Sequence, residues 1–348
     1  MIWLILLLLI AWWATLYLAL DKTEEKQQKK FDYKRTVYAK EFNNFEIKHS
    51  EFKKIFEGAS NYIVGLDNLL KAIIIWILSN WHILVEWMPW LAKTKTILVF
   101  SKLLDLDFKR IQFTPDMLPS DIIWWEIYDK KTWKFNVFFW PVFTNLLLAD
   151  EINRATPKVQ SALLEAMQER KVTIWWNTYE LPNPFFVMAT QNPIEQEWTF
   201  PLPEAQMDRF LMKIIVNYPE KENELKILNS YNKDIEKIAP LLSKDKLLEY
   251  QKEVNKVVVP DAIKEYVVDI INKLREKDEN ILFWPSPRWS ISLLKVSQAI
   301  AYLQNKEVVE KNDVDAAVLP VLRHRVKLSM KAILDWKNQD SIICKLIK

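Results

Sequence analysis

The sequence predicts an α/β fold with a parallel five-stranded sheet between helices, followed by an all-helical domain. Short apolar runs alternate with amphipathic helical segments before Pro219, which is typical of a parallel sheet covered on both faces. After Pro219 only helical patterns remain. A third observation is that the chain begins with twenty uncharged residues, which predicts an N-terminal transmembrane helix.

Length and charge limit the possible classes of protein. The 348 residues are enough for two folded units, each with its own core. The net charge is +3, with 48 basic and 45 acidic side chains well mixed, so no nucleic-acid partner is expected. The single cysteine, Cys344, excludes an internal disulfide framework and suits a reducing compartment. His49, His82 and His324 lie far apart in the sequence, and we interpret them as structural or surface residues.

The first segment, residues 1–20, is long enough to cross a bilayer as a helix. No basic residue precedes it, which argues against a cleavable signal peptide. Basic residues follow it between Lys22 and Arg35, so the positive-inside rule places the rest of the chain in the cytoplasm. We therefore expect a single-pass anchor in the cell membrane and a charged juxtamembrane stalk over residues 21–50. The alternatives are a buried helix or an uncleaved signal-like segment.

The core domain is expected over residues 51–218. Its strands are predicted at Ile83–Glu86, Phe108–Thr114, Leu146–Asp150, Phe185–Thr190 and Leu211–Val216. The helices predicted beside them are Leu66–Leu78, Lys93–Leu104 and Lys158–Arg170. A helical domain over residues 219–348 is expected to contain Glu222–Asn232, Asp245–Val254, Asp261–Lys277, Ser290–Gln304 and Lys311–Val326.

The turn after the first predicted strand ends with residues typical of a phosphate-binding loop. Lys93 and Thr94 open a helix just after a strand, where the helix N-terminus and backbone N–H groups hold phosphates. In such a loop the lysine reaches the β- and γ-phosphates of ATP and the threonine hydroxyl binds Mg²⁺. The preceding residues of the loop are Trp87, Met88, Pro89, Trp90, Leu91 and Ala92. Two of them are tryptophans at positions where such a loop needs glycine.

Composition offers an explanation for these tryptophans. The chain has 2 glycines and 17 tryptophans, and together they make about 5% of its residues, close to the ordinary glycine share. The pairs Trp124-Trp125 and Trp175-Trp176 stand in polar, turn-like surroundings, and several other tryptophans lie next to or near a proline. Our hypothesis is that most of these positions are UGA codons that the source organism reads as glycine. The alternative is that all 17 indoles are real, which puts bulky rings where the backbone must approach a triphosphate.

A second candidate motif is the run Asn145 to Ala155, NLLLADEINRA. An apolar strand that ends in Asp150 and Glu151 suits a Walker B motif, in which the aspartate binds Mg²⁺ through water and the glutamate polarises the attacking water. Two carboxylates at the end of a strand are common by themselves. The lysine and threonine upstream make the nucleotide-site interpretation the stronger one.

Long strings in this region resemble the MoxR family of AAA+ ATPases. They are LLLADEINRATPKVQSALLEAMQERKVTI and LPNPFFVMATQNPIEQEWTFPLPEAQMDRF, together with LPSDIIWWEIYD, SPRWSISLLKVSQAIAYL and VLPVLRHR. The resemblance runs from about Tyr62 to Val326. The first loop, with glycine at positions 87 and 90, resembles that family's Walker A, including Ala92.

The resemblance implies a role for individual residues. Lys93 and Thr94 match the nucleotide-binding pair, and Asp150 and Glu151 match Walker B. The remaining matches are Asn192 as sensor 1, which positions the lytic water, Arg209 as an arginine finger that reaches the neighbouring subunit's nucleotide, and Arg288 as sensor 2, which couples the lid to the phosphates. On a purely structural interpretation Arg209 pairs with Asp208 or Glu204 at the surface.

The function implied is a membrane-anchored ATPase that uses ATP and Mg²⁺ in a ring, expected to be a hexamer, to remodel or mature partner protein complexes. The partners implied include von Willebrand factor A-domain proteins. Members of the family are usually soluble, so the N-terminal helix departs from its pattern, and so do the tryptophans. One alternative is a non-hydrolysing membrane scaffold with a degenerate nucleotide site. Another is a nucleic-acid motor of the same superfamily, which the balanced charge disfavours.

Overall fold

The computed structural model describes residues 42, 45–87, 93–129, 134–139, 141–174, 176–192, 199–216, 221–229, 234–276, 279–282, 286–335 and 337–347. Residues 42–348 form one compact unit, and residues 1–41 are assigned to another. The expected membrane helix and most of the stalk therefore lie outside the described residues. Among the residues that are described, no helix has both the length and the apolar character needed to span a membrane.

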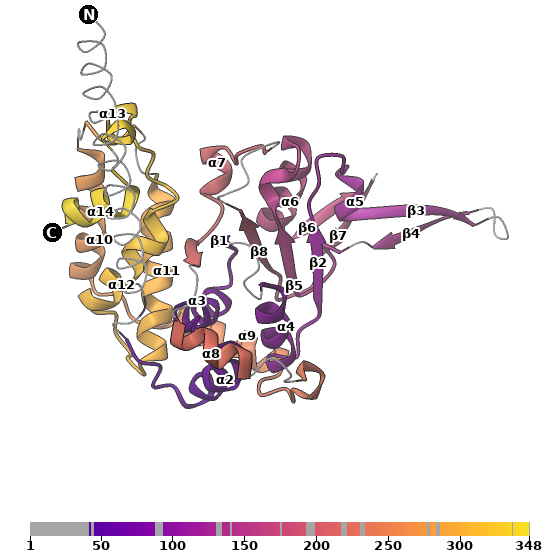
Figure 1. Ribbon diagram of the computed structural model, residues 1–348, viewed down its shortest axis with the longest axis horizontal. Helices are drawn as coiled ribbons and strands as arrows, with labels where there is room; N and C mark the ends of the chain where they lie inside the picture. Colours follow the sequence, from indigo (N-terminus) through magenta and orange to yellow (C-terminus); the bar gives the residue numbers. More distant parts are fainter. Residues whose placement is uncertain are drawn as a thin grey trace, which may run out of the picture. The chain divides into compact units, whose positions relative to one another are not determined.

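A parallel five-stranded sheet forms the centre of the compact unit, as predicted (Figure 1). Its strand order is β2-β5-β8-β1-β9, and each adjacent pair is parallel. The strands are β1 (Ile83–Trp87), β2 (Phe108–Gln112), β5 (Leu146–Asp150), β8 (Phe186–Gln191) and β9 (Met212–Val216). β2 ends two residues earlier than expected and a turn follows at residues 115–116, although the N–H of Phe113 still donates to the carbonyl of Asp150 in β5.

Both faces of the sheet are buried. Along β5, Leu146 and Leu148 belong to one apolar cluster, whereas Leu147 and Ala149 belong to the other. The first cluster includes the apolar sides of α2 (Ser50–Ser60), α3 (Asp67–Leu78) and α4 (Lys93–Leu103), and the second includes α6 (Pro157–Glu169). This two-sided burial explains why β5 is apolar at every position before Asp150.

Two antiparallel hairpins were not predicted. One joins β3 (Trp124–Asp129) to β4 (Lys134–Phe139), directly after the short helix α5 (Ser120–Ile123), and it projects away from the sheet in Figure 1. The other joins β6 (Lys171–Ile174) to β7 (Asn177–Glu180). Trp124 and Trp125 therefore begin a strand, where the sequence had indicated a turn. The β6 and β7 strands lack the continuous apolar run that predicts a buried strand.

The C-terminal part of the unit is helical, as expected. It contains α8 (Lys221–Asn229), α9 (Lys244–Val254), α10 (Asp261–Arg275), α11 (Pro287–Leu303), α12 (Lys311–Leu322), α13 (Met330–Leu334) and α14 (Gln339–Ile347). α7 (Glu204–Met207) is a single turn before β9. α12 ends four residues earlier than predicted because Arg323, His324 and Arg325 leave the helix and turn their side chains toward the main chain around β9. This contact joins the helical region to the sheet.

Candidate functional site

Polar residues meet at the carboxyl edge of the sheet. Asp150 ends β5 and Asn192 follows β8, while Lys93 begins the helix that comes after β1. Carboxyl ends of parallel strands lie at the same edge, which is where α/β proteins bind their ligands. Lys93 Nζ lies 3.7 Å from Asp150 Oδ1, so two candidate residues that are far apart in the sequence come together. Thr94 is half-buried beside Lys93, and Asn192 is buried.

Asp150 is held from three directions. Its Oδ1 accepts a hydrogen bond of 2.6 Å from the Thr190 hydroxyl, and its Oδ2 accepts one of 2.7 Å from Nη2 of Arg110. The carboxylate is 6% exposed, and Lys93 supplies a second cationic side chain near it. A buried carboxylate requires this kind of pairing, because a charge taken out of water without a partner is strongly destabilising.

Glu151 has an unusual backbone conformation. Its φ and ψ are 59° and 49°, in the left-handed region that non-glycine residues rarely adopt. The backbone N–H of Glu151 donates to the Thr190 hydroxyl at 3.0 Å, and Oε2 of Glu151 forms an ion pair with Nε of Arg154 at 2.9 Å. Such backbone strain concentrates at functional sites, where the surrounding structure holds it in place.

The donor set at this edge fits a nucleotide with Mg²⁺, apart from the loop itself. A threonine hydroxyl and a carboxylate are the hard oxygen ligands that Mg²⁺ prefers, and the lysine provides charge for a phosphate. Trp87 does not fit, because its side chain is fully buried and its indole N–H has no partner among the described residues. The candidates from Met88 to Ala92 lie outside the described residues.

Arg209 and Arg288 lie elsewhere. Both line a pocket of about 250 Å³ together with Arg170, Lys295 and other residues. His82 and Leu211, which also line it, precede β1 and β9, so the pocket is at the amino edge of the sheet, opposite Lys93 and Asp150. The predicted residues thus form two groups at opposite edges of one sheet.

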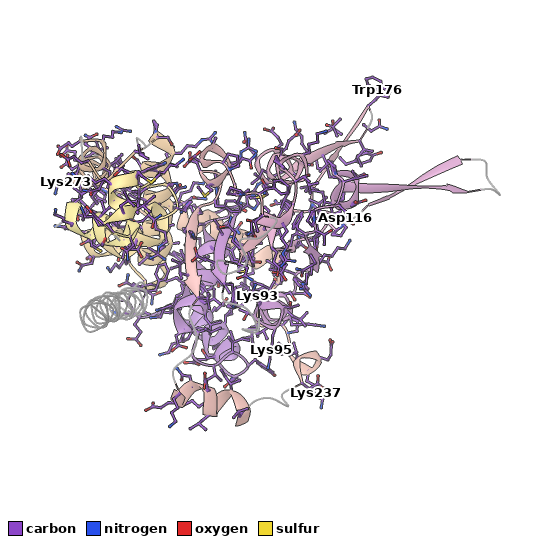
Figure 2. All side chains as sticks on the ribbon, turned by 45° about the horizontal axis from the view of Figure 1, so that its top comes forward. Lys93, Lys95, Asp116, Trp176, Lys237 and Lys273 are labelled. Atoms are coloured by element: carbon purple, nitrogen blue, oxygen red, sulfur yellow. The ribbon has the colours of Figure 1, made fainter. Side chains whose placement is uncertain are left out.

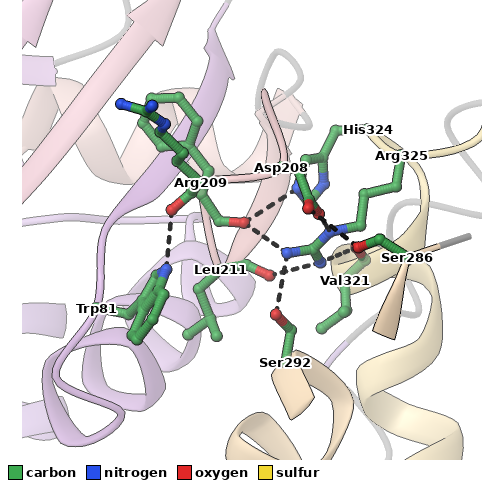
Figure 3. A network of polar contacts seen from close by, with 10 residues as sticks. Trp81, Asp208, Arg209, Leu211, Ser286, Ser292, Val321, His324 and Arg325 are labelled. Carbon is green, nitrogen blue, oxygen red and sulfur yellow. Dashed lines mark hydrogen bonds and ion pairs between the residues drawn. The ribbon is translucent and has the colours of Figure 1, made fainter. Parts of the chain in front are cut away.

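The alternative interpretation of Arg209 as a surface ion pair is wrong for the described residues. Asp208 pairs with Arg325 at 2.9 Å, and Glu204 pairs with Lys327. The Arg209 side chain points away from the buried polar network beside it (Figure 3). Within the described residues, the two acidic partners considered for Arg209 are thus paired with other side chains.

His82 is a buried structural histidine. Its Nδ1 accepts a hydrogen bond of 3.1 Å from the N–H of Val187, so its Nε2 donates to the carbonyl of Met167 at 2.9 Å. Burial lowers the pKa of His82 to about 3, which keeps the ring neutral. No group of three or more metal-ligating side chains occurs in the described part of the chain.

Sequence reasoning missed Arg110, Thr190 and Arg325. Thr190 lies two residues before Asn192, the expected sensor 1, and its place at the end of a strand was a usable signal. Arg110 gave none, since a charged residue on an edge strand usually points to solvent. Arg325 lies in the string VLRHR, where two arginines and a histidine after a helix resemble a solvated terminus.

Comparisons with known proteins agree with this geometry. Residues 82–212 match the model of the ATPase family associated with various cellular activities, and residues 278–345 match the AAA lid domain. The chain is 39% identical to the chaperone MoxR1 of Mycobacterium tuberculosis over 308 residues, which cover 86% of this chain and 81% of that protein.

The chain belongs to the MoxR family of AAA+ ATPases. It is also 40% identical to the protein YeaC of Bacillus subtilis over 301 residues, covering 86% of this chain and 94% of that one. A crystal structure from Cytophaga hutchinsonii that carries an ATPase assignment superposes with a TM-score of 0.80 at 37% identity, covering 94% of this chain and 97% of that chain. The fold and lid of this MoxR family member are therefore those expected from the resemblance.

Proposed function

We propose that this MoxR family protein binds ATP with Mg²⁺ at the carboxyl edge of its sheet and hydrolyses it within a ring of subunits. The observation that carries the proposal is the convergence of Lys93 and Asp150 at 3.7 Å, beside a Glu151 held in a left-handed conformation. Each part has the chemistry that phosphoryl transfer needs, namely a phosphate-binding cation, a magnesium ligand and a group that polarises water.

Each residue at this edge has a distinct role in nucleotide binding or hydrolysis. Lys93 contacts the β- and γ-phosphates, Thr94 and Asp150 would hold Mg²⁺, and Glu151 orients and polarises the attacking water with help from Asn192. Mg²⁺ held there would supply positive charge to the phosphate oxygens. Thr190 fixes both acidic residues, because its hydroxyl is bonded to the side chain of one and the main chain of the other.

Arg209 and Arg288 serve the nucleotide of the neighbouring subunit. The proposal is supported by their position at the edge opposite Lys93, in a pocket with Arg170 and Lys295. An arginine supplied in trans stabilises transition-state charge and is worth on the order of 10³–10⁵ in rate. A head-to-tail interface of this kind closes into a ring, and we expect a hexamer.

The phosphate-binding loop of the working protein has glycine at positions 87 and 90. A buried indole N–H without a partner costs about 1–3 kcal/mol, and a glycine at position 87 removes that cost. A second tryptophan supports the same interpretation. Trp176 is 95% exposed in a connection of only two residues between β6 and β7, a place where glycine is favoured, and Figure 2 shows it at the tip of that hairpin.

The ring acts as a chaperone-like machine on partner protein complexes, with von Willebrand factor A-domain proteins among the partners. The similarity to the chaperone MoxR1 of Mycobacterium tuberculosis supports this part of the proposal. Residues 1–20 anchor the ring in the cell membrane with the ATPase on the cytoplasmic side, which is supported by their lack of charge and by the basic residues after them.

Changing Glu151 to glutamine tests the function in the full chain with glycine at the tryptophan positions. ATP binding is expected to persist while hydrolysis falls by about 10²–10⁴-fold, because only the group that polarises water is lost. Glu165→Gln, on the exposed side of α6, is the matched control and keeps the parent rate. Hydrolysis by Glu151→Gln at the parent rate would exclude the assigned role, and a parent protein without ATPase activity would favour the scaffold alternative.

A further inference from the structure

A buried polar joint connects the segment that carries Arg209 to the helical domain (Figure 3). At its centre is Arg325, whose side chain is 1% exposed. Its Nε donates to Asp208 Oδ1 at 2.9 Å, and its two terminal nitrogens donate to the carbonyls of Phe210 at 2.8 Å and Leu211 at 3.1 Å. These acceptors lie on both sides of Arg209 in the chain.

The same guanidinium is bonded to the helical domain. Its terminal nitrogens also donate to the carbonyl of Val321 at 2.6 Å and to the hydroxyl of Ser292 at 3.0 Å. Arg325 thus makes five hydrogen bonds, which is the full number of N–H donors that an arginine carries. Ser286, which immediately precedes α11, adds a link of 3.2 Å from its hydroxyl to Asp208 Oδ2.

The two residues before Arg325 reinforce the joint. A ring nitrogen of His324 lies 3.2 Å from the carbonyl of Phe210. Arg323 pairs with Asp340 of α14 at 3.0 Å and donates to the carbonyl of Lys213 in β9 at 3.4 Å. Three consecutive side chains therefore hold the main chain from Phe210 to Lys213 against the helical domain.

The side chain of Arg209 itself takes no part in this network and points away from it in Figure 3. Its position is set by the main chain on either side, which Arg325 holds. An arginine finger needs such support, since a displacement of about 1 Å in a catalytic arrangement costs on the order of 10²-fold in rate.

We propose that Arg325 is a positioning residue for the finger Arg209, which it fixes to the helical domain of the same subunit. The finger and the start of α11, which carries Arg288, then move as one body when the helical domain moves. This inference rests on the proposed ATPase function with a finger in trans.

Arginine is required at this position because of its geometry as well as its charge. Burial lowers the pKa of Arg325 to about 10 while Asp208 acts in the opposite direction, so the side chain is charged at neutral pH. Lysine retains that charge but has only three donors and no planar fork, so it cannot hold Asp208 and four further acceptors together.

Mixing of subunits in the full, glycine-bearing chain tests the inference. Arg325→Lys is expected to bind ATP like the parent, because the nucleotide site at its own carboxyl edge is intact, but to have about 10–100-fold lower ATPase activity. Co-assembly with Glu151→Gln subunits should restore ATPase activity, because these subunits supply an intact arginine finger to the nucleotide sites of Arg325→Lys subunits. In a 1:1 ring, random assembly puts about one site in four between an intact catalytic pocket and an intact finger.

Two controls and one alternative variant make each result decisive. Arg209→Ala mixed with Glu151→Gln sets the recovery expected for loss of a finger, and failure of that pair contradicts the trans finger and with it both proposals. Arg323→Lys changes an equally buried arginine whose carboxylate partner lies in α14, and should keep more activity than Arg325→Lys at matched loss of thermal stability.

If Arg209→Ala recovers on mixing and a folded Arg325→Lys does not, or if Arg325→Lys is fully active alone, the positioning role is wrong while the ATPase function stands. If Arg325→Lys fails to fold, Ser286→Ala tests the same joint, and parent activity for that variant counts against the inference.

Discussion

The Thr190 hydroxyl donates a hydrogen bond of 2.6 Å to Oδ1 of Asp150, from β8 to the neighbouring strand β5. The same oxygen accepts a hydrogen bond from the backbone N–H of Glu151 at 3.0 Å. Thr190 is fully buried, so water cannot replace it. One hydroxyl thus orients the carboxylate assigned to Mg²⁺ and also holds the main chain of Glu151 in its left-handed conformation.

Thr190→Val should weaken Mg²⁺-dependent nucleotide binding and ATPase activity by about 10–100-fold, the range seen when a group that orients a metal ligand is removed. Valine keeps the shape of threonine and removes only the hydroxyl. Binding of a fluorescent ATP analogue, titrated with Mg²⁺, measures the effect apart from turnover. Thr190→Ser retains the hydroxyl and should stay close to the parent, and equal losses in both variants would contradict the orienting role.

The stability of the folded chain should depend on pH through His82. The folded-state pKa is about 3, below the ordinary value of 6.5, so the unfolded state binds more protons between those values. Stability is therefore full above pH 6.5 and decreases as the pH falls toward 3, by up to about 1.4 kcal/mol per pH unit from this residue. Denaturant unfolding at a series of pH values measures the slope.

His82→Gln can retain both hydrogen bonds without a titrating ring, so its stability should fall less steeply below pH 6.5. His49→Gln serves as the comparison, because burial lowers the pKa of His49 as well but that ring is only partly buried. An unchanged slope in His82→Gln would show that the neutral buried histidine does not control acid sensitivity.

The sequence was informative where burial or motif chemistry leaves a one-dimensional pattern. β5 is apolar through Ala149 because both of its faces are covered. Lys93 follows an apolar strand and its loop, and Asp150 ends an apolar strand, so both could be recognised as motif residues. The separation of Arg209 from Lys93 was not visible in the sequence, because it depends on which edge of the sheet each loop meets. Arg325 was missed for a related reason. Some of its five acceptors lie more than a hundred residues away from it in the sequence, and the others lie in its own helical domain.

Intact mass tests the proposal that the tryptophans are glycine. Protein isolated from its native host should be lighter than the printed sequence by one tryptophan-to-glycine difference for each recoded position. Sequencing of the gene should find UGA at positions 87 and 90. A mass that matches the printed sequence, or UGG at both positions, would contradict the proposal.

The most direct test of the account is ATP binding by two forms of the full chain, one with tryptophan and one with glycine at positions 87 and 90. The main chain before Lys93 has to approach the phosphates closely, which glycine permits and a bulky side chain obstructs. Calorimetric titration with a non-hydrolysable ATP analogue and Mg²⁺ should give saturable binding to the glycine form and at least about tenfold weaker binding to the tryptophan form. Equal, tight binding to both forms would contradict the central claim that this edge is a phosphate-binding site built on glycine.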